Sequence, residues 1–347
     1  MASIEPLELI AVAQALMAKG KGLLAMDESN STCNQRFASL GIPETEEARR
    51  AYRDLLVTTP GLGEFISGAI LCDETLHQHA ADGTPFLRVL KAAGIIPGIK
   101  VDLGAAGLAA HPTERVTEGL DGLRVRLQRY VNMGARFTKW RAVIAIGDGL
   151  PSAACIEANA HALARYAALC QEAALVPIVE PEVLMDGGHT LQRCLEVTQE
   201  VLHQVFDQLH RQGVVLEAMI LKPGMVLPGL ACATQEPVDA VAEATLRCLL
   251  RGVPAAVAGV AFLSGGQSDA LASAHLNAMH RQIGSPRTRP PPWPLTFSFG
   301  RALQQRAMAL WAGSPAHRAG AQQALLHRAR CNAAAVRGDY RQEMEAP

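Results

Sequence analysis

The sequence is poor in aromatic residues and lacks long uncharged apolar runs. Only 4% of its 347 residues are Phe, Trp or Tyr, although 49% are hydrophobic. Ala, Val, Ile and Leu must therefore fill the core, which suits helices packed on a parallel sheet. No apolar run is long enough to span a membrane, and residues 1–19 lack a basic start followed by an apolar signal core. We expect neither a membrane protein nor an exported one.

An excess of charge and clustered cysteines are also missing. The 33 acidic and 32 basic residues leave a net charge of −1, which argues against a nucleic-acid-binding face. The eight cysteines form no CxxC pair, so we expect reduced thiols in the cytoplasm and no zinc site. His77 and His79 fall on different faces of a predicted helix. The sequence therefore predicts no metal and no cofactor.

What the sequence does contain is a series of short, apolar, β-prone runs that alternate with helical patterns. There are eight: Gly22–Asp27, Phe65–Cys72, Ile95–Asp102, Arg136–Ile146, Val176–Val183, Val215–Met225, Ala255–Ser264 and Leu295–Gly300. Alternating buried strands and helices indicate an α/β fold with a parallel sheet. Because no Gly-rich dinucleotide motif follows the first strand, an open doubly wound sheet is disfavoured. We predict a single (β/α)8 TIM barrel over residues 1–347, with extra terminal helices and flexible ends near 1–4 and 339–347.

Charged residues interrupt the apolar strands near their C-terminal ends. In strand order they are Asp27 and Glu28, Lys100 and Asp102, Lys139 and Arg141, Glu180 and Glu182, and Lys222. Three of these pairs are separated by one residue, which places both side chains on one face of a strand. A single charge at such a position commonly just caps a strand. Charges on five strands that converge on one mouth of a barrel predict an active site there.

Lys222 ends an apolar strand that stops at Pro223. Burial and neighbouring cations favour the neutral form of a lysine, and a neutral amine can attack a ketone to form an imine. In a closed barrel Lys139, Glu180 and Lys222 lie on successive strands, which supplies a nucleophile, a proton carrier and a second cation. The alternative is an ordinary ion pair of Lys222 with Glu180 or Glu182, and the sequence leaves it open.

Two further segments have the character of phosphate sites. Ser264-Gly265-Gly266 follows the seventh strand, and Ser298-Phe299-Gly300-Arg301 ends the eighth. The loops after strands 7 and 8 form the recurring phosphate site of this fold, and an arginine binds phosphate through two hydrogen bonds. Asp27 is a candidate base for a substrate hydroxyl, with a helix cap or a salt bridge as the alternative. Arg36 is a candidate for a second phosphate, although a lone arginine is more often a surface residue.

Taken together, these segments resemble class I fructose-bisphosphate aldolase. The motifs that carry the resemblance are Leu24-Ala25-Met26-Asp27-Glu28-Ser29, Gly98-Ile99-Lys100-Val101-Asp102, Thr138-Lys139-Trp140-Arg141, Pro177-Ile178-Val179-Glu180-Pro181-Glu182, Leu221-Lys222-Pro223 and Leu263-Ser264-Gly265-Gly266-Gln267-Ser268. They occur in the family's order between about residue 5 and Tyr340. The stretch from Asp27 to Cys33 is more similar to the plastid and bacterial branch.

The resemblance implies a role for each matched residue. Lys222 would form the imine with dihydroxyacetone phosphate, Glu180 would shuttle protons, and Lys139 would support carbinolamine formation. Asp27 would take the C4 hydroxyl proton when the carbon–carbon bond breaks. The remaining residues are Lys100 and Glu182, which would tune the charge; Ser264, Gly265 and Arg301 for the ketose C1 phosphate; and Thr32, Arg36 and Arg141 for the other phosphate.

The resemblance further implies a homotetramer that needs no metal and acts on phosphorylated ketoses and trioses. Three departures affect this expectation. Gln35 and Leu103 stand where the family usually has basic residues, and the sequence ends without the family's tyrosine-tipped tail. We therefore expect an imine-forming enzyme with slow protonation of its enamine. Fructose 1,6-bisphosphate is the first expected substrate, in glycolysis, gluconeogenesis or the Calvin cycle. Sedoheptulose 1,7-bisphosphate, fructose 1-phosphate, other Schiff-base aldolase activities and a non-catalytic scaffold are the alternatives.

Overall fold

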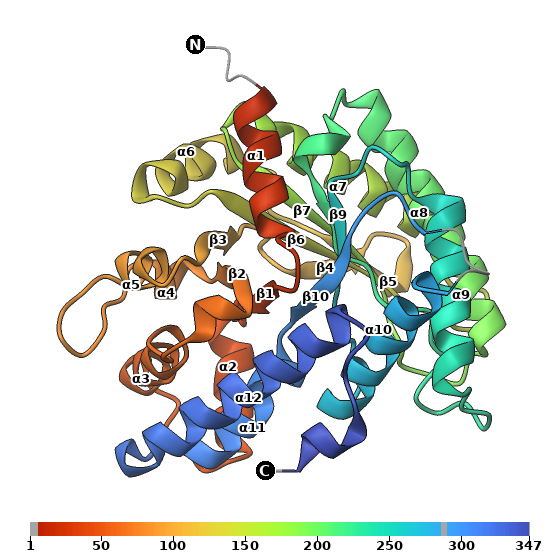
Figure 1. Cartoon of the computed structure of the whole chain (residues 1–347). Helices are drawn as coiled ribbons and strands as arrows, with labels where there is room; N and C mark the ends of the chain where they lie inside the picture. Colours follow the sequence, from red (N-terminus) through yellow and green to blue (C-terminus); the bar gives the residue numbers. More distant parts are fainter. Residues whose placement is uncertain (1–5, 286–289, 347) are drawn as a thin grey trace.

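The computed structural model describes residues 6–285 and 290–346, which form a closed barrel of eight parallel strands (Figure 1). The predicted N-terminal loose end lies outside the described residues. Around the barrel the strands run in the order β1-β10-β9-β8-β7-β6-β3-β2. They span β1 Gly22–Ala25, β2 Ile66–Leu71, β3 Ile96–Lys100, β6 Phe137–Ile144, β7 Val176–Val183, β8 Ile220–Leu221, β9 Gly259–Phe262 and β10 Leu295–Phe299. The predicted fold class is confirmed.

Helices surround the barrel, and each predicted strand is found. The helices are α1 Pro6–Leu16, α2 Asn30–Ala38, α3 Glu46–Val57, α4 Asp73–Leu76, α5 Phe86–Ala92, α6 Leu123–Met133, α7 Ala153–Glu172, α8 Leu191–Arg211, α9 Val238–Gly252, α10 Asp269–Ile283, α11 Arg301–Trp311 and α12 Arg318–Val336, with 3₁₀ turns η1 Leu62–Glu64, η2 Leu216–Ala218, η3 Pro315–His317 and η4 Gln342–Glu345. Within the described residues, no helix is both long and apolar enough to cross a membrane.

Two details differ from the sequence-based expectation. The sixth predicted strand shrinks to the two residues of β8, because η2 occupies its first part. In addition, a hairpin of β4 (Ala105–Leu108) and β5 (His111–Thr117) was not predicted. Most residues of its strands are half-buried or exposed, and they lack the apolar character of the barrel strands.

The N-terminal ends of the strands are closed by α1, which Figure 1 shows against one end of the barrel. Its Leu9, Ala13 and Leu16 join the interior cluster together with strand residues such as Phe137. The interior is tightly filled there, since a Cβ on Gly98 would lie 2.3 Å from the Phe137 ring. With this end packed by apolar side chains, only the C-terminal ends of the strands remain for polar chemistry.

The C-terminal stretch, for which the sequence predicted flexibility from residue 339, packs against the preceding helix in the structure. Tyr340 is buried and donates a hydrogen bond to Glu345 over 2.7 Å. Glu345 also forms a 2.5 Å ion pair with Arg328, whose side chain is 1% exposed. These contacts anchor η4 to α12.

Candidate active site

Four charged side chains form a continuous chain of ion pairs at the C-terminal mouth of the barrel. Asp27 follows β1, Lys139 lies in β6, Glu180 lies in β7, and Lys222 directly follows β8. Lys139 Nζ is 2.7 Å from Asp27 Oδ2 and 3.1 Å from Glu180 Oε2, and Lys222 Nζ is 2.9 Å from Glu180 Oε1. The structure thus brings the predicted nucleophile, proton carrier, second cation and base together.

The parallel sheet positions these residues by register. Lys100 on β3 and Ile178 on β7 both pair with Lys139 on β6, and Glu180 on β7 pairs with Arg141. The backbone N–H of Lys222 donates to the carbonyl of Val179 over 2.8 Å, which extends the short strand β8 by one residue. Lys139 and Glu180 therefore lie on strands of the barrel, and Asp27 and Lys222 come within two residues of a strand end.

Burial makes the cluster a strong electrostatic unit. Lys139, Glu180 and Lys222 are each 3–4% exposed. Burial alone would raise the pKa of Glu180, but Lys139 and Lys222 outweigh it and hold that pKa below its usual value. Burial likewise opposes ionisation of Asp27, and again Lys139 and Lys222 hold the pKa of that carboxyl well below its usual range. Both carboxylates are therefore ionised at neutral pH.

The two lysines of the cluster differ in their partners. Burial would lower the pKa of Lys139, yet Asp27 and Glu180 raise it well above the ordinary value for a lysine. Lys139 therefore remains a cation between two carboxylates. Lys222 forms an ion pair with one carboxylate, Glu180, among the residues that the structure describes. The ion pair that the sequence left open is present, and it joins Lys222 to the proton carrier.

These residues line a cavity of about 850 Å³. Of the residues predicted for the site, the cavity lining includes Asp27, Thr32, Arg36, Lys100, Lys139, Arg141, Glu180, Glu182, Lys222, Ser264, Gly265, Ser298, Gly300 and Arg301. Gly266 does not line it, but an added Cβ there would lie 3.2 Å from Nη2 of Arg301. The cavity spans the whole mouth of the barrel, from the loop after β1 to the loop after β10.

On one side of this cavity the predicted phosphate loop has the backbone shape of an anion site. Gly265 and Gly266 have φ values of +60° and +95°, a conformation that glycine adopts without strain. Gln267 Nε2 donates to the carbonyl of Ser264 over 3.0 Å and fixes the turn. Arg301 begins α11, so the N-terminus of that helix faces the same space. Helix N-termini and turn N–H groups favour anions.

The other side of the cavity is formed by the start of α2. Ser29 caps this helix by accepting a hydrogen bond from the N–H of Thr32 over 3.3 Å. The cap is thus Ser29, and Asp27 does not have the capping role considered as its alternative. Asp102 was predicted to lie at the barrel mouth but was assigned no role, and Ser29 was not among the predicted site residues. Their spacing in the sequence could have identified them as site residues, because Ser29 follows Asp27 by two residues and Asp102 follows Lys100 by two.

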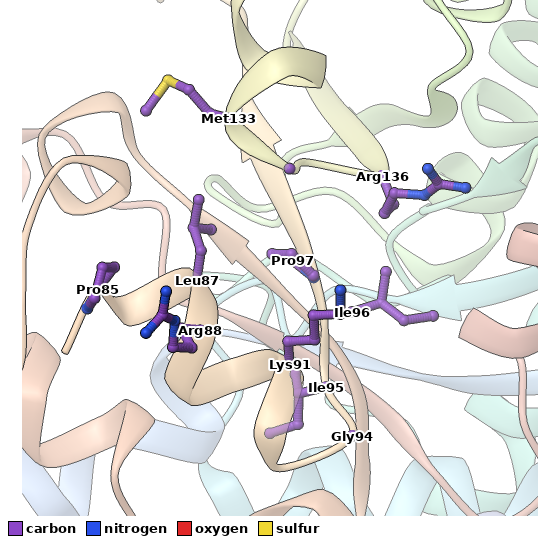
Figure 2. A pocket seen from close by; sticks show the side chains of 11 residues that line it. Pro85, Leu87, Arg88, Lys91, Gly94, Ile95, Ile96, Pro97, Met133 and Arg136 are labelled. Atoms are coloured by element: carbon purple, nitrogen blue, oxygen red, sulfur yellow. The ribbon is translucent and has the colours of Figure 1, made fainter.

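A second hollow, of about 720 Å³, differs from the mouth cavity in the side chains that line it (Figure 2). It lies at the N-terminal ends of β3 and β6. Figure 2 shows Arg88 and Lys91 on α5 and Arg136 ahead of β6, around Leu87 and Met133. Its lining contains no carboxylate, histidine or cysteine to pair with these cations. Of these two hollows, the mouth cavity is the one whose lining pairs carboxylates with cations.

Comparison with known proteins agrees with this geometry. The profile of the family described as fructose-bisphosphate aldolase class-I matches residues 8–347. The chain belongs to this family. The class I aldolases similar to it include a "probable fructose-bisphosphate aldolase class 1" of Xanthomonas axonopodis pv. citri, which is 56% identical over 96% of this chain and 98% of the relative. A chloroplastic fructose-bisphosphate aldolase of Chlamydomonas reinhardtii is 49% identical over 96% of this chain and 86% of the relative.

A solved aldolase structure matches the fold. The fructose-bisphosphate aldolase of Plasmodium falciparum, crystallised with TRAP and a small-molecule inhibitor, superimposes with a TM-score of 0.93 at 47% identity. The match covers 96% of this chain and 95% of that one. As a class I aldolase, the protein is an enzyme of the lyase class.

Proposed function

We propose that the protein cleaves fructose 1,6-bisphosphate reversibly into dihydroxyacetone phosphate and glyceraldehyde 3-phosphate through an imine on Lys222. The observation that carries the proposal is the buried chain of ion pairs Asp27–Lys139–Glu180–Lys222. It holds a nucleophile and a proton carrier 2.9 Å apart at the end of an open cavity. Imine chemistry requires such a pair.

The first half of the reaction uses Lys222 and Glu180. Proton transfer across their 2.9 Å contact leaves a neutral amine and a carboxylic acid. The amine adds to the C2 carbonyl, and the acid returns its proton to the carbinolamine hydroxyl, which leaves as water. The product is a protonated imine on Lys222. Lys139, held as a cation, offsets the negative charge of both carboxylates throughout.

The second half uses Asp27. Its carboxylate, ionised at neutral pH, takes the proton of the C4 hydroxyl, and the C3–C4 bond breaks. The aldehyde leaves, and the bonding electrons move to the imine nitrogen to give an enamine. The proton that Asp27 has taken balances the one that the enamine then receives at C3, and hydrolysis of the imine by water releases dihydroxyacetone phosphate and restores Lys222. Asp27, Lys139, Glu180 and Lys222, which act in the earlier steps, all line the cavity.

The remaining site residues divide between the two ends of the substrate. We assign the C1 phosphate to the loop of Ser264, Gly265 and Gly266 together with Ser298, Gly300 and Arg301. We assign the second phosphate to Thr32, Arg36 and Arg141, with Lys100 and Glu182 adjusting local charge. Ser298 supports the first assignment, because its buried Oγ has no hydrogen-bond partner among the described residues.

We further propose a cytoplasmic homotetramer that acts in glycolysis, gluconeogenesis or the Calvin cycle. The eight cysteines are free, and seven are buried, as suits a reducing compartment. A tetramer is supported only by family membership. Analytical ultracentrifugation of the purified protein would measure the oligomeric state directly.

Borohydride trapping tests the proposal. The protein is incubated with dihydroxyacetone phosphate, reduced with borohydride and mapped by peptide mass spectrometry, alongside Lys222→Met. We expect an adduct on Lys222 that is absent from the variant and unaffected by EDTA. If folded wild-type protein carries no adduct on Lys222, the imine mechanism is wrong and the scaffold alternative takes its place. A panel of ketose phosphates, including sedoheptulose 1,7-bisphosphate, then settles the substrate.

A further inference from the structure

The two segments assigned to the C1 phosphate each lead into a helix. The turn of Ser264, Gly265 and Gly266 precedes α10, and Arg301 is the first residue of α11. The geometry of this phosphate site therefore depends on how α10 and α11 lie relative to each other. Charged side chains join the two helices close to their N-termini.

The first residue of α10 is held through both its side chain and its backbone. Asp269 Oδ2 lies 2.5 Å from Nε of Arg306 on α11. The backbone carbonyl of Asp269 accepts a hydrogen bond over 2.9 Å from Nη2 of Arg328 on α12. Arg328 is buried, and its Nη2 also donates to Ser273 Oγ over 2.7 Å. Because Asp269 follows Gly266 by three residues, these contacts anchor the end of the phosphate turn.

The C-terminal turn η4 completes this cluster through Glu345. The carboxylate of Glu345 lies 2.5 Å from Arg328 Nη1 and 3.1 Å from Arg306 Nη2. Burial would raise the pKa of Glu345, but hydrogen bonds from Arg328 and Tyr340 outweigh it and hold that pKa below its ordinary value. The cluster therefore sets two arginines against two carboxylates, Asp269 and Glu345. Glu345 itself does not line the mouth cavity.

Loss of the charge on Glu345 would redistribute these contacts. Arg328 is buried, and a buried guanidinium is costly without a carboxylate partner. The remaining carboxylate of the cluster is Asp269, whose Oδ2 lies 3.7 Å from Arg328 Nε. Asp269 would then be shared between Arg328 and Arg306, which weakens the link between α10 and α11.

We infer that Glu345 is a positioning residue for the C1-phosphate site, because η4 holds α10 and α11 in the arrangement that brings the phosphate turn and Arg301 together. The inference rests on the proposed aldolase function and adds to it a role for the C-terminal segment. Coupling between two sites is reciprocal. A phosphate ester bound at the turn must therefore hold η4 more firmly in return.

Steady-state kinetics with fructose 1,6-bisphosphate test the inference in the full-length enzyme. Glu345→Gln should raise KM by roughly fivefold or more, the lower end of the coupling usual between distinct sites, and should change kcat by less than about twofold. The matched control is Glu343→Gln, which removes the same charge from an exposed position of η4. Arg306→Gln should also raise KM. The double variant with Glu345→Gln should raise KM by less than the product of the two single effects, because both residues act through one cluster.

Hydrogen exchange of residues 340–346 gives a second readout. Saturating dihydroxyacetone phosphate should slow exchange of this segment in the wild type and in Glu343→Gln. In Glu345→Gln the segment should exchange faster, and the ligand should protect it less. A residue that only stabilised the fold would not make this protection depend on the ligand.

A KM for Glu345→Gln equal to that of Glu343→Gln would overturn the inference even if thermal stability falls, because the cluster would then be only structural. Exchange that dihydroxyacetone phosphate leaves unchanged in the wild type would overturn it as well. Both results leave the aldolase function intact, since the wild type still cleaves the bisphosphate and is still trapped on Lys222. If the wild type neither cleaves the substrate nor forms the adduct, the proposed function fails and the inference falls with it.

Discussion

Replacing Lys139 by methionine should destabilise the protein in a way that depends on pH. The lysine is 3% exposed and forms ion pairs with Asp27 and Glu180. Methionine preserves much of the side-chain volume but removes the charge. Glu180 keeps Lys222 as a partner, whereas Asp27 loses its direct ion pair. The variant therefore buries one uncompensated negative charge.

The size of the effect follows from these contacts. At an effective dielectric constant near 20, charges about 3 Å apart attract by roughly 5 kcal/mol, and desolvation of the buried lysine offsets part of that gain. Removing one partner of a buried ion pair usually costs about 3–5 kcal/mol. We therefore expect the free energy of unfolding of Lys139→Met to fall by about 3–5 kcal/mol at pH 8.

The pH dependence has a definite sign. In the wild type Lys139 and Lys222 hold the pKa of Asp27 well below its usual range, so its stabilising contribution persists down to about pH 4. Without Lys139, burial still opposes ionisation of Asp27, and only Lys222 and Lys100 remain to favour it, so we expect the folded pKa of Asp27 to rise. The destabilisation is then greatest at high pH and is relieved as the pH falls through that raised pKa, by about 1.4 kcal/mol per unit.

Urea unfolding followed by circular dichroism at pH 8 and pH 5.5 measures the effect. Protein concentration must be fixed, since subunit association would shift the apparent stability. Lys91→Met, at an exposed position on α5, is the matched control and should change stability little at either pH. An equal loss at both pH values would show that shape rather than charge is responsible, and would refute the electrostatic reasoning.

Two further predictions concern a buried histidine and the packing of the barrel interior. Burial lowers the pKa of His275 to about 4, and its Nδ1 lies 2.6 Å from Gln267 Oε1. The stability that neutral His275 contributes is present above about pH 6.5 and is lost as the pH falls toward 4, by up to about 3 kcal/mol. His275→Gln should flatten the pH dependence of urea unfolding in that window, and an unchanged slope would contradict this. Gly98→Ala places a Cβ against the Phe137 ring and should lower the free energy of unfolding by about 1–3 kcal/mol. The control Gly107→Ala adds a Cβ in open space and should have little effect. Equal urea midpoints for the two variants would contradict the packing argument.

Much of the fold could be predicted because its signals are local. Most residues of the barrel strands are buried, so these strands form short apolar runs in the sequence, as Gly259–Phe262 does on β9. The hairpin of β4 and β5 was not predicted because its strands are only partly buried and contain no such run. The length of β8 was overestimated because Leu216 and Ala218 of η2 continue the apolar run, although Glu217 between them is charged. Apolar character reports burial and does not distinguish a 3₁₀ turn from a strand.

The candidate site could be predicted in its members but not in its pairings. The positions of Lys139, Glu180 and Lys222 in, or directly after, successive strands indicated that they would meet. Their division of roles depends on which carboxylate each lysine reaches, and that is visible only in the structure. The pairing of Glu28 with both Arg36 and Arg53 had no local signal, because it joins a loop residue to two different helices.

By itself, the sequence determined where the strands lie, which ends carry charge, and which side chains share a face, because the two-residue repeat of a strand is a local property. The tertiary structure decided the rest. Asp27 follows β1 and Lys139 lies in β6, strands that are not neighbours in the barrel, yet their charged atoms are 2.7 Å apart. That contact exists because closure of the barrel turns both side chains into one mouth. Burial of the mouth strengthens the attraction between these charges. It therefore keeps Asp27 and Glu180 as anions and Lys139 as a cation.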